Sequence, residues 1–326
     1  MSYLQKWHIA ERGREGRMRY RALGRTGLEV SILGFGGSPL GGVFGEVDQE
    51  ECVQTVHAAL DAGVNYFDVA PFYGLTRAES MLGQCLAGIP REKYVLSTKV
   101  GRYGGADFDF SAARVTLSVE ESLQRIGVEM IDLLVCHDIE YVSLDQIVEE
   151  TLPALRKIQA TGKVRFLGIS GLPLKIFRTI LDRTDLDFVL SYCHYSLNDT
   201  SLESLLPTLR ERGVGVINAS ALGMGLLTDR PLPDWHPAPP EMRTAAAAAA
   251  AYCKGQGVEL SRLGLQFALA NPEIATTLVG IADRATLTKN MAALESTPDP
   301  ELLRNVQDIL RPVHNLSWPS GRPENS

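Results

Sequence analysis

The chain has 326 residues, of which 45% are hydrophobic and 22% charged, and its formal net charge at pH 7 is −7. This balance is typical of a globular protein, and without a dense cluster of Lys and Arg it argues against a nucleic-acid binder. No apolar run approaches the roughly 18 uninterrupted residues of a membrane-spanning helix. We therefore expect a small-molecule partner, with no nucleic acid and no membrane, and a monomer or weak homodimer.

Two segments precede the repeating part of the chain. Residues 1–18 mix Arg and Lys with Glu11 and Glu15 and contain no apolar stretch, so they match neither a secretory signal nor a transit peptide, and we expect a loose extension. The short runs Tyr20–Leu23 and Leu28–Val30 then flank a four-residue turn with two glycines. This pattern predicts a β-hairpin, which would close the bottom of the main fold.

Eight short apolar runs then alternate with longer amphipathic stretches, which predicts βα units that build a parallel sheet. The predicted strands are Ile32–Gly36, Tyr66–Asp68, Val95–Val100, Ile131–His137, Arg165–Ser170, Phe188–Ser191, Val214–Asn218 and Thr277–Val279. The predicted helices are Gln49–Ala62, Arg77–Leu86, Ala112–Ile126, Leu144–Ala160, Leu174–Asp182, Leu202–Glu211 and Glu241–Cys253.

The number of units predicts the fold class. Eight βα units over roughly 280 residues fit an α/β fold of the (β/α)8 TIM barrel type, closed below by the N-terminal hairpin. No composition shift marks an internal boundary, so we expect one domain over residues 19–312 and a C-terminal tail over residues 313–326 near the substrate face. The segment Arg230–Pro240 contains five prolines and is predicted to be a loop at the top face.

Four polar residues mark the ends of neighbouring predicted strands: Asp68, Tyr73, Lys99 and His137. Barrel enzymes place their chemistry at strand ends. A lysine ammonium within about 4–6 Å of a tyrosine favours the phenolate, so we expect Lys99 to lower the pKa of Tyr73, with Asp68 holding the ammonium. His137 would orient a substrate oxygen. Each residue alone is more often structural, but their joint placement predicts proton transfer beside a hydride-accepting cofactor.

Cysteine and histidine spacing predicts no metal site. The five cysteines include no Cys-x-x-Cys pair, so we expect neither a disulfide framework nor a zinc ribbon, and a reduced, cytoplasmic location. His57, His137 and His194 lack the spacings that bind metals in known motifs.

At the four strand-end residues the chain resembles a known family, the aldo-keto reductases. The segment Gly63–Gly74 is similar to the family signature around a catalytic aspartate and tyrosine, and Leu96–Lys99 and Leu133–His137 are similar to its lysine and histidine strands. The similarity continues over nearly the whole chain, from Arg21 to Leu294. It implies a (β/α)8 barrel, a nicotinamide cofactor bound without a Rossmann domain, and a catalytic tetrad of Asp68, Tyr73, Lys99 and His137.

The resemblance also implies cofactor contacts, and several differ from those of commoner members. Gly171 stands where an asparagine usually holds the carboxamide, Ser191 stands where a glutamine usually ends the sixth strand, and a stacking tyrosine is replaced within Ile217–Gly225. The cofactor-binding candidates are Ser170, Gly171, Ser191, Ser220, Leu222, Gly280, Arg284 and Asn290.

These departures, together with Trp318–Gly321 in the tail, are similar to a sugar 1-dehydrogenase branch of the family. The resemblance implies oxidation of the anomeric C1 hydroxyl of an aldose, with L-galactose favoured, to a lactone on a route towards ascorbate, with Tyr73 as general base. Alternatives are another sugar, such as L-fucose or D-arabinose, and a general NADPH-dependent reductase of aldehydes and ketones. A cofactor-binding regulatory subunit is the alternative without activity, and the intact tetrad favours the enzyme.

Charges near the expected cofactor site favour NAD over NADP. Selecting NADP needs cations at its 2′-phosphate. The family's usual lysine and arginine positions correspond to Gly280 and Thr286, and Asp283 would repel a phosphate. Arg284 is the one candidate exception, and its alternative role is a solvent-facing charge in the first turn of a helix.

Aromatic and polar residues on the expected top-face loops are the candidates for sugar binding, with core or surface packing as the alternative for each. They are Phe44, Tyr103, His194, Tyr195, Trp235 and Trp318.

Overall fold

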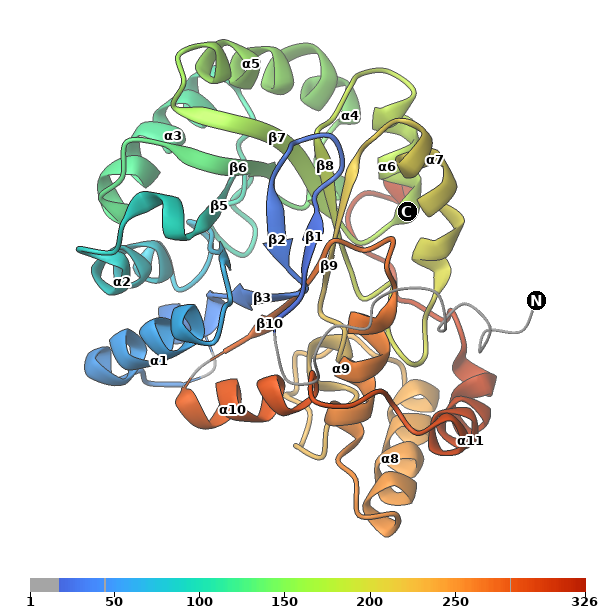
Figure 1. Ribbon diagram of the computed structural model, residues 1–326. Helices are drawn as coiled ribbons and strands as arrows, with labels where there is room; N and C mark the ends of the chain where they lie inside the picture. The colour runs from blue at the N-terminus through green and yellow to red at the C-terminus, as the bar shows by residue number, and fades with distance from the viewer. Residues whose placement is uncertain (1–17, 44, 282) are drawn as a thin grey trace.

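Eight parallel strands close into a barrel in the order β10-β3-β4-β5-β6-β7-β8-β9 (Figure 1). The structure is a computed structural model that describes residues 18–43, 45–281 and 283–326. The barrel strands are β3 (Leu33–Gly36), β4 (Tyr66–Asp68), β5 (Val95–Val100), β6 (Ile131–Cys136), β7 (Val164–Gly171), β8 (Phe188–Tyr192), β9 (Gly215–Ala219) and β10 (Thr276–Gly280). The predicted (β/α)8 barrel is confirmed.

Helices surround the barrel and pack their apolar faces on the outside of the strands (Figure 1). They are α1 (Gln49–Asp61), α2 (Arg77–Leu86), α3 (Ala112–Ile126), α4 (Leu144–Gln146), α5 (Leu152–Ala160), α6 (Leu174–Leu181), α7 (Leu206–Glu211), α8 (Pro240–Gly255), α9 (Leu260–Ala270), α10 (Arg284–Ala292) and α11 (Pro300–Leu310).

The predicted N-terminal hairpin covers the amino-terminal end of the barrel, as expected. Its antiparallel strands are β1 (Tyr20–Ala22) and β2 (Glu29–Ser31), and they cross the barrel opening in Figure 1. Leu23 and Val30 are fully buried in the apolar cluster that fills the barrel interior. Gly24 allows the turn to approach so closely, because a Cβ there would lie 2.3 Å from the backbone nitrogen of Gly215 and its φ is +54°.

Two helical regions differ from the sequence-based prediction. The predicted helix Leu144–Ala160 is interrupted by a π-helical turn over Ile147–Thr151, because Pro153 has no N–H for the normal i→i−4 bond. The predicted helices ended at Cys253 and did not include α9, α10 or α11. Eight residues of α9 are buried, so this helix lacks the polar face that makes an amphipathic helix visible in a sequence.

The C-terminal tail docks on the loop that follows β6. The backbone oxygen of Glu140 in this loop accepts hydrogen bonds from the Arg322 nitrogen and from Asn325 Nδ2, both at 2.9 Å. The Ser320 hydroxyl donates to Glu140 Oε1 at 3.1 Å. The tail therefore lies over the carboxyl ends of the barrel strands, opposite the hairpin.

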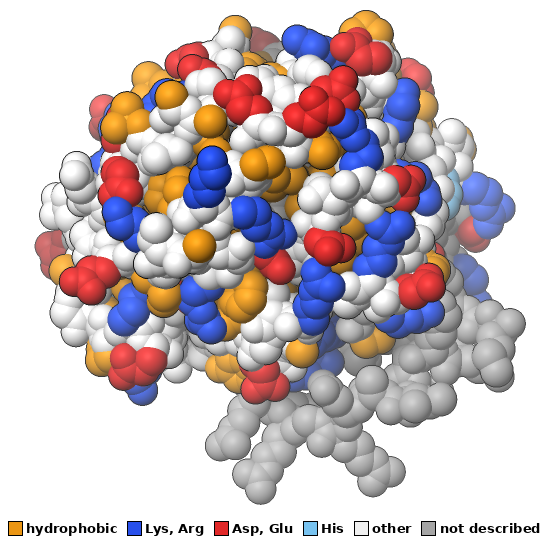
Figure 2. Space-filling model, turned by 90° about the horizontal axis from the view of Figure 1, so that it is seen from above, with side chains coloured by type: hydrophobic (Ala, Val, Ile, Leu, Met, Phe, Trp, Pro, Cys, Tyr) orange, Lys and Arg blue, Asp and Glu red, His pale blue; other side chains and the backbone are white. Residues whose placement is uncertain are grey.

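One face of the molecule carries mixed charge. Figure 2 shows the face on which α5 lies, where Lys and Arg side chains are interspersed with Asp and Glu. Among the described residues, no helix has the length and apolar character needed to cross a membrane.

Candidate active site

The four predicted catalytic side chains meet at the carboxyl ends of three adjacent strands. Asp68 is the last residue of β4, Lys99 lies near the end of β5, and His137 follows β6 directly. Pairing of Asp68 with Ser97 and of Lys99 with Val135 sets these strands in register. Tyr73 reaches the same place from the loop after β4, and its ring centroid lies 4.8 Å from Lys99 Nζ.

A buried ion pair fixes the lysine. Lys99 Nζ donates to Asp68 Oδ1 and, at 2.9 Å, to the backbone oxygen of Val69. The other carboxylate oxygen of Asp68 accepts a hydrogen bond from Ser97 Oγ at 2.8 Å. Lys99 and Asp68 are only 1% and 3% exposed. With both partners desolvated and hydrogen-bonded, the ammonium has one stable position beside Tyr73.

The directions of the pKa shifts of Lys99 and Tyr73 indicate that each group keeps its proton. Burial by itself lowers the pKa of Lys99, but the Asp68 carboxylate and the Tyr73 phenol outweigh burial and raise it. Burial raises the pKa of Tyr73, and the Lys99 ammonium opposes that increase without reversing it. The expectation that Lys99 brings this pKa below its ordinary value is therefore wrong in net direction, because desolvation of the phenolate outweighs the attraction of the ammonium.

His137 is a neutral imidazole packed against the tyrosine. The two rings meet edge to face with centroids 5.7 Å apart. Burial lowers the pKa of His137 to about 3, and the Lys99 and Arg102 cations add to this effect. Its Nδ1 is buried and has no hydrogen-bond partner among the described residues. A neutral imidazole can offer one N–H to a substrate oxygen without carrying charge.

An arginine and an aspartate that the sequence analysis did not single out lie beside the histidine. Arg102 donates to Asp138 Oδ2, and its guanidinium carbon lies 3.9 Å from the ring centroid of Phe72. Asp138 adopts the left-handed conformation with φ +54°, and its Oδ2 lies 3.6 Å from His137 Nε2. The only sequence signal for Asp138 is its place directly after the histidine.

The residues predicted to contact the cofactor differ in how their polar atoms are used. Ser170 Oγ donates to Asp138 Oδ1 at 3.2 Å and accepts from the Asp138 nitrogen at 3.0 Å. In contrast, Ser191 Oγ and Asn290 Nδ2 are buried and have no partner within the part of the chain that the structure describes. Such orphaned polar atoms fit a polar ligand that satisfies them.

The other residues predicted to contact the cofactor would do so through backbone groups or through a charged side chain. Ser220, just beyond β9, has a left-handed backbone with φ +54°, and Leu222 follows in the same loop. Gly280 ends β10. At Gly171 a Cβ would lie 2.5 Å from Glu140 Oε2, so the buried glutamate occupies the space beside the position where an asparagine usually stands. Arg284 forms an ion pair with Glu51 at 2.9 Å.

The residues predicted to contact the sugar differ in their exposure and in their partners. Trp235 is 61% exposed on the Pro-rich loop, and Trp318 packs edge to face on His236 of that loop with centroids 5.7 Å apart. His194 is buried, with Nδ1 at 2.9 Å from Ser201 Oγ and 3.2 Å from an oxygen of Asp199.

The other aromatic candidates also have partners. The hydroxyl of Tyr103 accepts from the Gly101 nitrogen at 3.2 Å, and Tyr195 is buried and stacked on Phe267. Phe44 lies outside the described residues.

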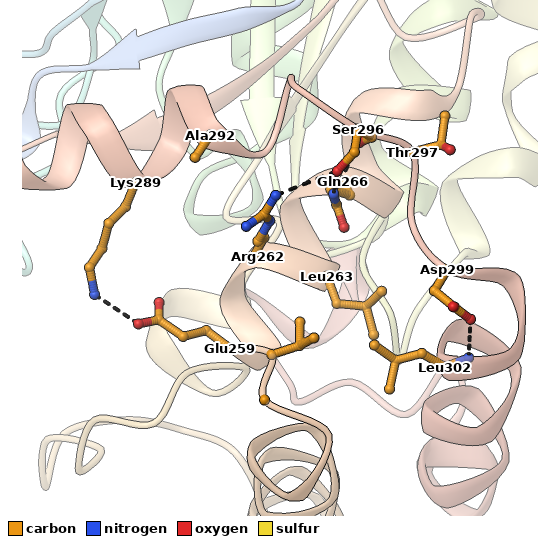
Figure 3. A pocket seen from close by; sticks show the side chains of 12 residues that line it. Glu259, Arg262, Leu263, Gln266, Lys289, Ala292, Ser296, Thr297, Asp299 and Leu302 are labelled. Atoms are coloured by element: carbon orange, nitrogen blue, oxygen red, sulfur yellow. Dashed lines mark hydrogen bonds and ion pairs between the residues drawn. The ribbon is translucent and has the colours of Figure 1, made fainter. Parts of the chain in front are cut away.

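One groove of the described surface lies away from the tetrad. It has a volume of about 540 Å³ and is lined by residues of α9, α10 and the segment before α11. Figure 3 shows the ion pair of Lys289 with Glu259, at 2.9 Å, on its wall. No member of the tetrad lines it. Within the described segments no group of three or more His, Cys, Asp or Glu side chains is arranged to hold a metal ion.

A parallel barrel with a buried Lys–Asp pair, a tyrosine and a neutral histidine at its carboxyl face defines an α/β-barrel enzyme. The aldo/keto reductase family model matches residues 32–311, and the chain belongs to this family. It is accordingly an oxidoreductase of the kind that works with a nicotinamide cofactor.

Individual relatives extend the similarity over nearly the whole length. The chain is 52% identical to L-galactose dehydrogenase of Arabidopsis thaliana, covering 95% of this chain and 99% of that protein. It is 32% identical to D-threo-aldose 1-dehydrogenase of a Pseudomonas species, covering 84% and 93% of the two chains. A solved aldo-keto reductase of Bacillus halodurans in its holo form superposes with a TM-score of 0.77 at 27% identity, covering 93% and 99%.

Proposed function

We propose that this protein is an NAD-dependent sugar 1-dehydrogenase that oxidises the C1 hydroxyl of an aldose to a lactone, with L-galactose as the preferred sugar. The observation that carries the chemistry is the desolvated Lys99–Asp68 pair beside Tyr73. The sugar is supported by the 52% identity to L-galactose dehydrogenase over almost the full length. The lactone would feed a route towards ascorbate.

Each member of the tetrad has a defined task in this proposal. Tyr73 Oη removes the proton of the C1 hydroxyl, and the Lys99 ammonium stabilises the phenolate that receives it. Asp68 is a positioning residue, because its contact with Lys99 Nζ keeps the ammonium beside the ring. Neutral His137 orients the substrate oxygen. When bound, the nicotinamide supplies the acceptor for the hydride that leaves C1.

NAD is the proposed cofactor because the positions that carry cations in the family hold Gly280 and Thr286 here. Ser191 and Asn290, whose buried polar atoms lack partners, are the residues proposed to hold it. We also propose a cytoplasmic location, supported by five cysteines that are all buried and free.

A panel of sugars and aldehydes tests the reaction. Absorbance follows formation of NADH or NADPH from NAD or NADP with L-galactose, L-fucose and D-arabinose, and consumption of NADH or NADPH with simple aldehydes. Turnover of L-galactose with NAD at the highest kcat/KM is expected. Absence of turnover with every sugar and aldehyde would refute the enzyme proposal, and preference for aldehydes with NADPH would replace it by a general reductase.

A tyrosine variant tests the mechanism. Tyr73→Phe should lower turnover by about a hundredfold or more, the usual contribution of a general acid–base group, and leave cofactor binding intact. Because burial raises the pKa of Tyr73, wild-type oxidation should accelerate as the pH rises from 7 to 9. Tyr252→Phe is the control, since this tyrosine lies on α8 and bonds to Asn305 at 2.9 Å. Full activity of Tyr73→Phe would exclude the proton-transfer role.

A further inference from the structure

A carboxylate on α1 is already bound to Arg284, the cationic candidate near the expected 2′-phosphate position. Arg284 is the first residue of α10, which follows the eighth barrel strand. Glu51 Oε1 accepts hydrogen bonds from the Arg284 backbone nitrogen at 3.0 Å and from its Nε at 3.2 Å. Glu51 Oε2 accepts from Nη2 at 2.9 Å. Both oxygens of the carboxylate thus contact this one arginine, and Oε1 also accepts from Thr55 Oγ1 at 3.5 Å.

Packing of α1 on α10 holds the carboxylate there. Cys52 and Val56 of α1 share an apolar cluster with Ile281 and Leu287, which flank the start of α10. The side chain of Asp48 caps α1 by accepting from the Glu51 nitrogen at 2.8 Å. The first turn of α1 is therefore fixed next to the first turn of α10, although the Arg284 and Glu51 side chains remain 55% and 32% exposed.

Negative charge at the N-terminal end of α10 disfavours phosphate binding there. Free backbone amides at a helix N-terminus attract phosphate, but here carboxylates accept from two of them. Asp283 Oδ1 accepts from the Thr286 nitrogen at 2.7 Å, and Glu51 accepts from the Arg284 nitrogen. Hydrogen bonds from Arg284 lower the pKa of Glu51, so it is anionic at neutral pH. Two negative charges therefore face one positive charge at this end.

The same helix carries an independent sign of a ligand. Asn290 is 8% exposed, and its Nδ2 has no partner among the described residues. In (β/α)8 barrels the loops after the last strands and a nearby helix N-terminus often bind phosphate groups of ligands. The family uses a nicotinamide cofactor, and NADP differs from NAD only by its 2′-phosphate.

We propose that Glu51 sets the cofactor preference of this protein, by holding Arg284 away from a 2′-phosphate and by repelling that phosphate itself. A carboxylate near an adenosine ribose tolerates a 2′-hydroxyl but not a 2′-phosphate, whereas an arginine accommodates the phosphate. The inference rests on the proposed NAD-dependent function and assigns its cofactor selectivity to α1, the helix that follows the first barrel strand and packs on α10.

Calorimetric titration of the full chain with NAD and with NADP tests the assignment without turnover. Glu51→Gln removes the negative charge and weakens the contact with Arg284, so the affinity of the variant for NADP should rise about tenfold or more, as expected for one new charge-assisted contact. Its affinity for NAD should change less than about threefold. Glu50→Gln removes the same charge one residue away, from a side chain whose Oε1 bonds Gln54, and should change neither affinity comparably.

A second substitution separates the contribution of Arg284 from the direct repulsion by the Glu51 charge. Arg284→Ala should cancel the gain for NADP in the Glu51→Gln background and should have little effect in the wild type, where the arginine is occupied. Unchanged NADP affinity in Glu51→Gln, or a wild type that binds NADP as tightly as NAD, would overturn the inference. A wild type that binds neither dinucleotide would refute the cofactor proposal itself, whereas binding without sugar turnover would refute only the proposed reaction.

Discussion

The glutamate that fastens the C-terminal tail should make the stability of this protein depend on pH. Glu140 is fully buried. Its Oε1 accepts from the Leu172 nitrogen, the Tyr192 hydroxyl and the Ser320 hydroxyl, each at 3.1 Å. Its Oε2 is buried and has no partner among the described residues. Desolvation of this carboxylate is therefore only partly compensated.

The magnitude follows from the pKa of this carboxyl. Burial, with a contribution from the nearby Asp138 carboxylate, raises the pKa of Glu140 from 4.5 to about 7. The folded state therefore binds this proton more tightly than the unfolded chain, and stability falls as the pH rises from about 4.5 to 7. At 1.36 kcal/mol per pH unit, the full loss is about 3 kcal/mol. Arg102, which is paired with Asp138, limits the repulsion between the two carboxylates.

Urea unfolding of wild type and Glu140→Gln between pH 5 and 8 measures the effect. The glutamine is neutral at every pH, so the wild type should lose about 2 to 3 kcal/mol relative to the variant across this range. Glu211→Gln, an exposed carboxyl on α7, is the control for loss of one negative charge. A difference between wild type and Glu140→Gln that stays constant within about 0.5 kcal/mol would show that Glu140 does not titrate there, and would refute the reasoning.

Three further substitutions or titrations test the site. Asp68→Asn leaves the Lys99 ammonium buried without its counter-charge, so urea unfolding should show a loss of about 3 kcal/mol or more, and a loss below about 1 kcal/mol would contradict the buried pair. Gly171→Ala places a Cβ 2.2 Å from a neighbouring side chain and should cost about 1–3 kcal/mol. Gly255→Ala meets nothing within 4 Å and should leave Tm unchanged or raised, and equal Tm values for the two variants would exclude overpacking at Gly171. Because burial lowers the pKa of His137 to about 3, its NMR signals should not titrate between pH 5 and 8. An inflection near 6.5 that disappears in His137→Gln would contradict this burial effect.

The order of strands and the barrel followed from the sequence because each βα unit is specified locally. Short apolar runs such as Val95–Val100 are buried throughout, and the amphipathic stretches between them can bury only one face. The hairpin was equally local, since its glycines and its length prescribe the turn. The helices that were not predicted depend on their neighbours: α9 is apolar on most sides because it lies between the barrel and the outer helices α8 and α10.

The sequence by itself placed the tetrad, because parallel strands end at one face and their last residues must meet there. Only the tertiary structure determined the pKa shifts and the ion pairs around the site. The net rise in the pKa of Tyr73 comes from desolvation by surroundings that no spacing rule contains. Likewise, Glu51 and Arg284 are 233 residues apart in the chain and become partners because barrel closure places α1 beside α10. Through-space charge and burial are sums over the packed molecule, so they appear only once the chain has folded.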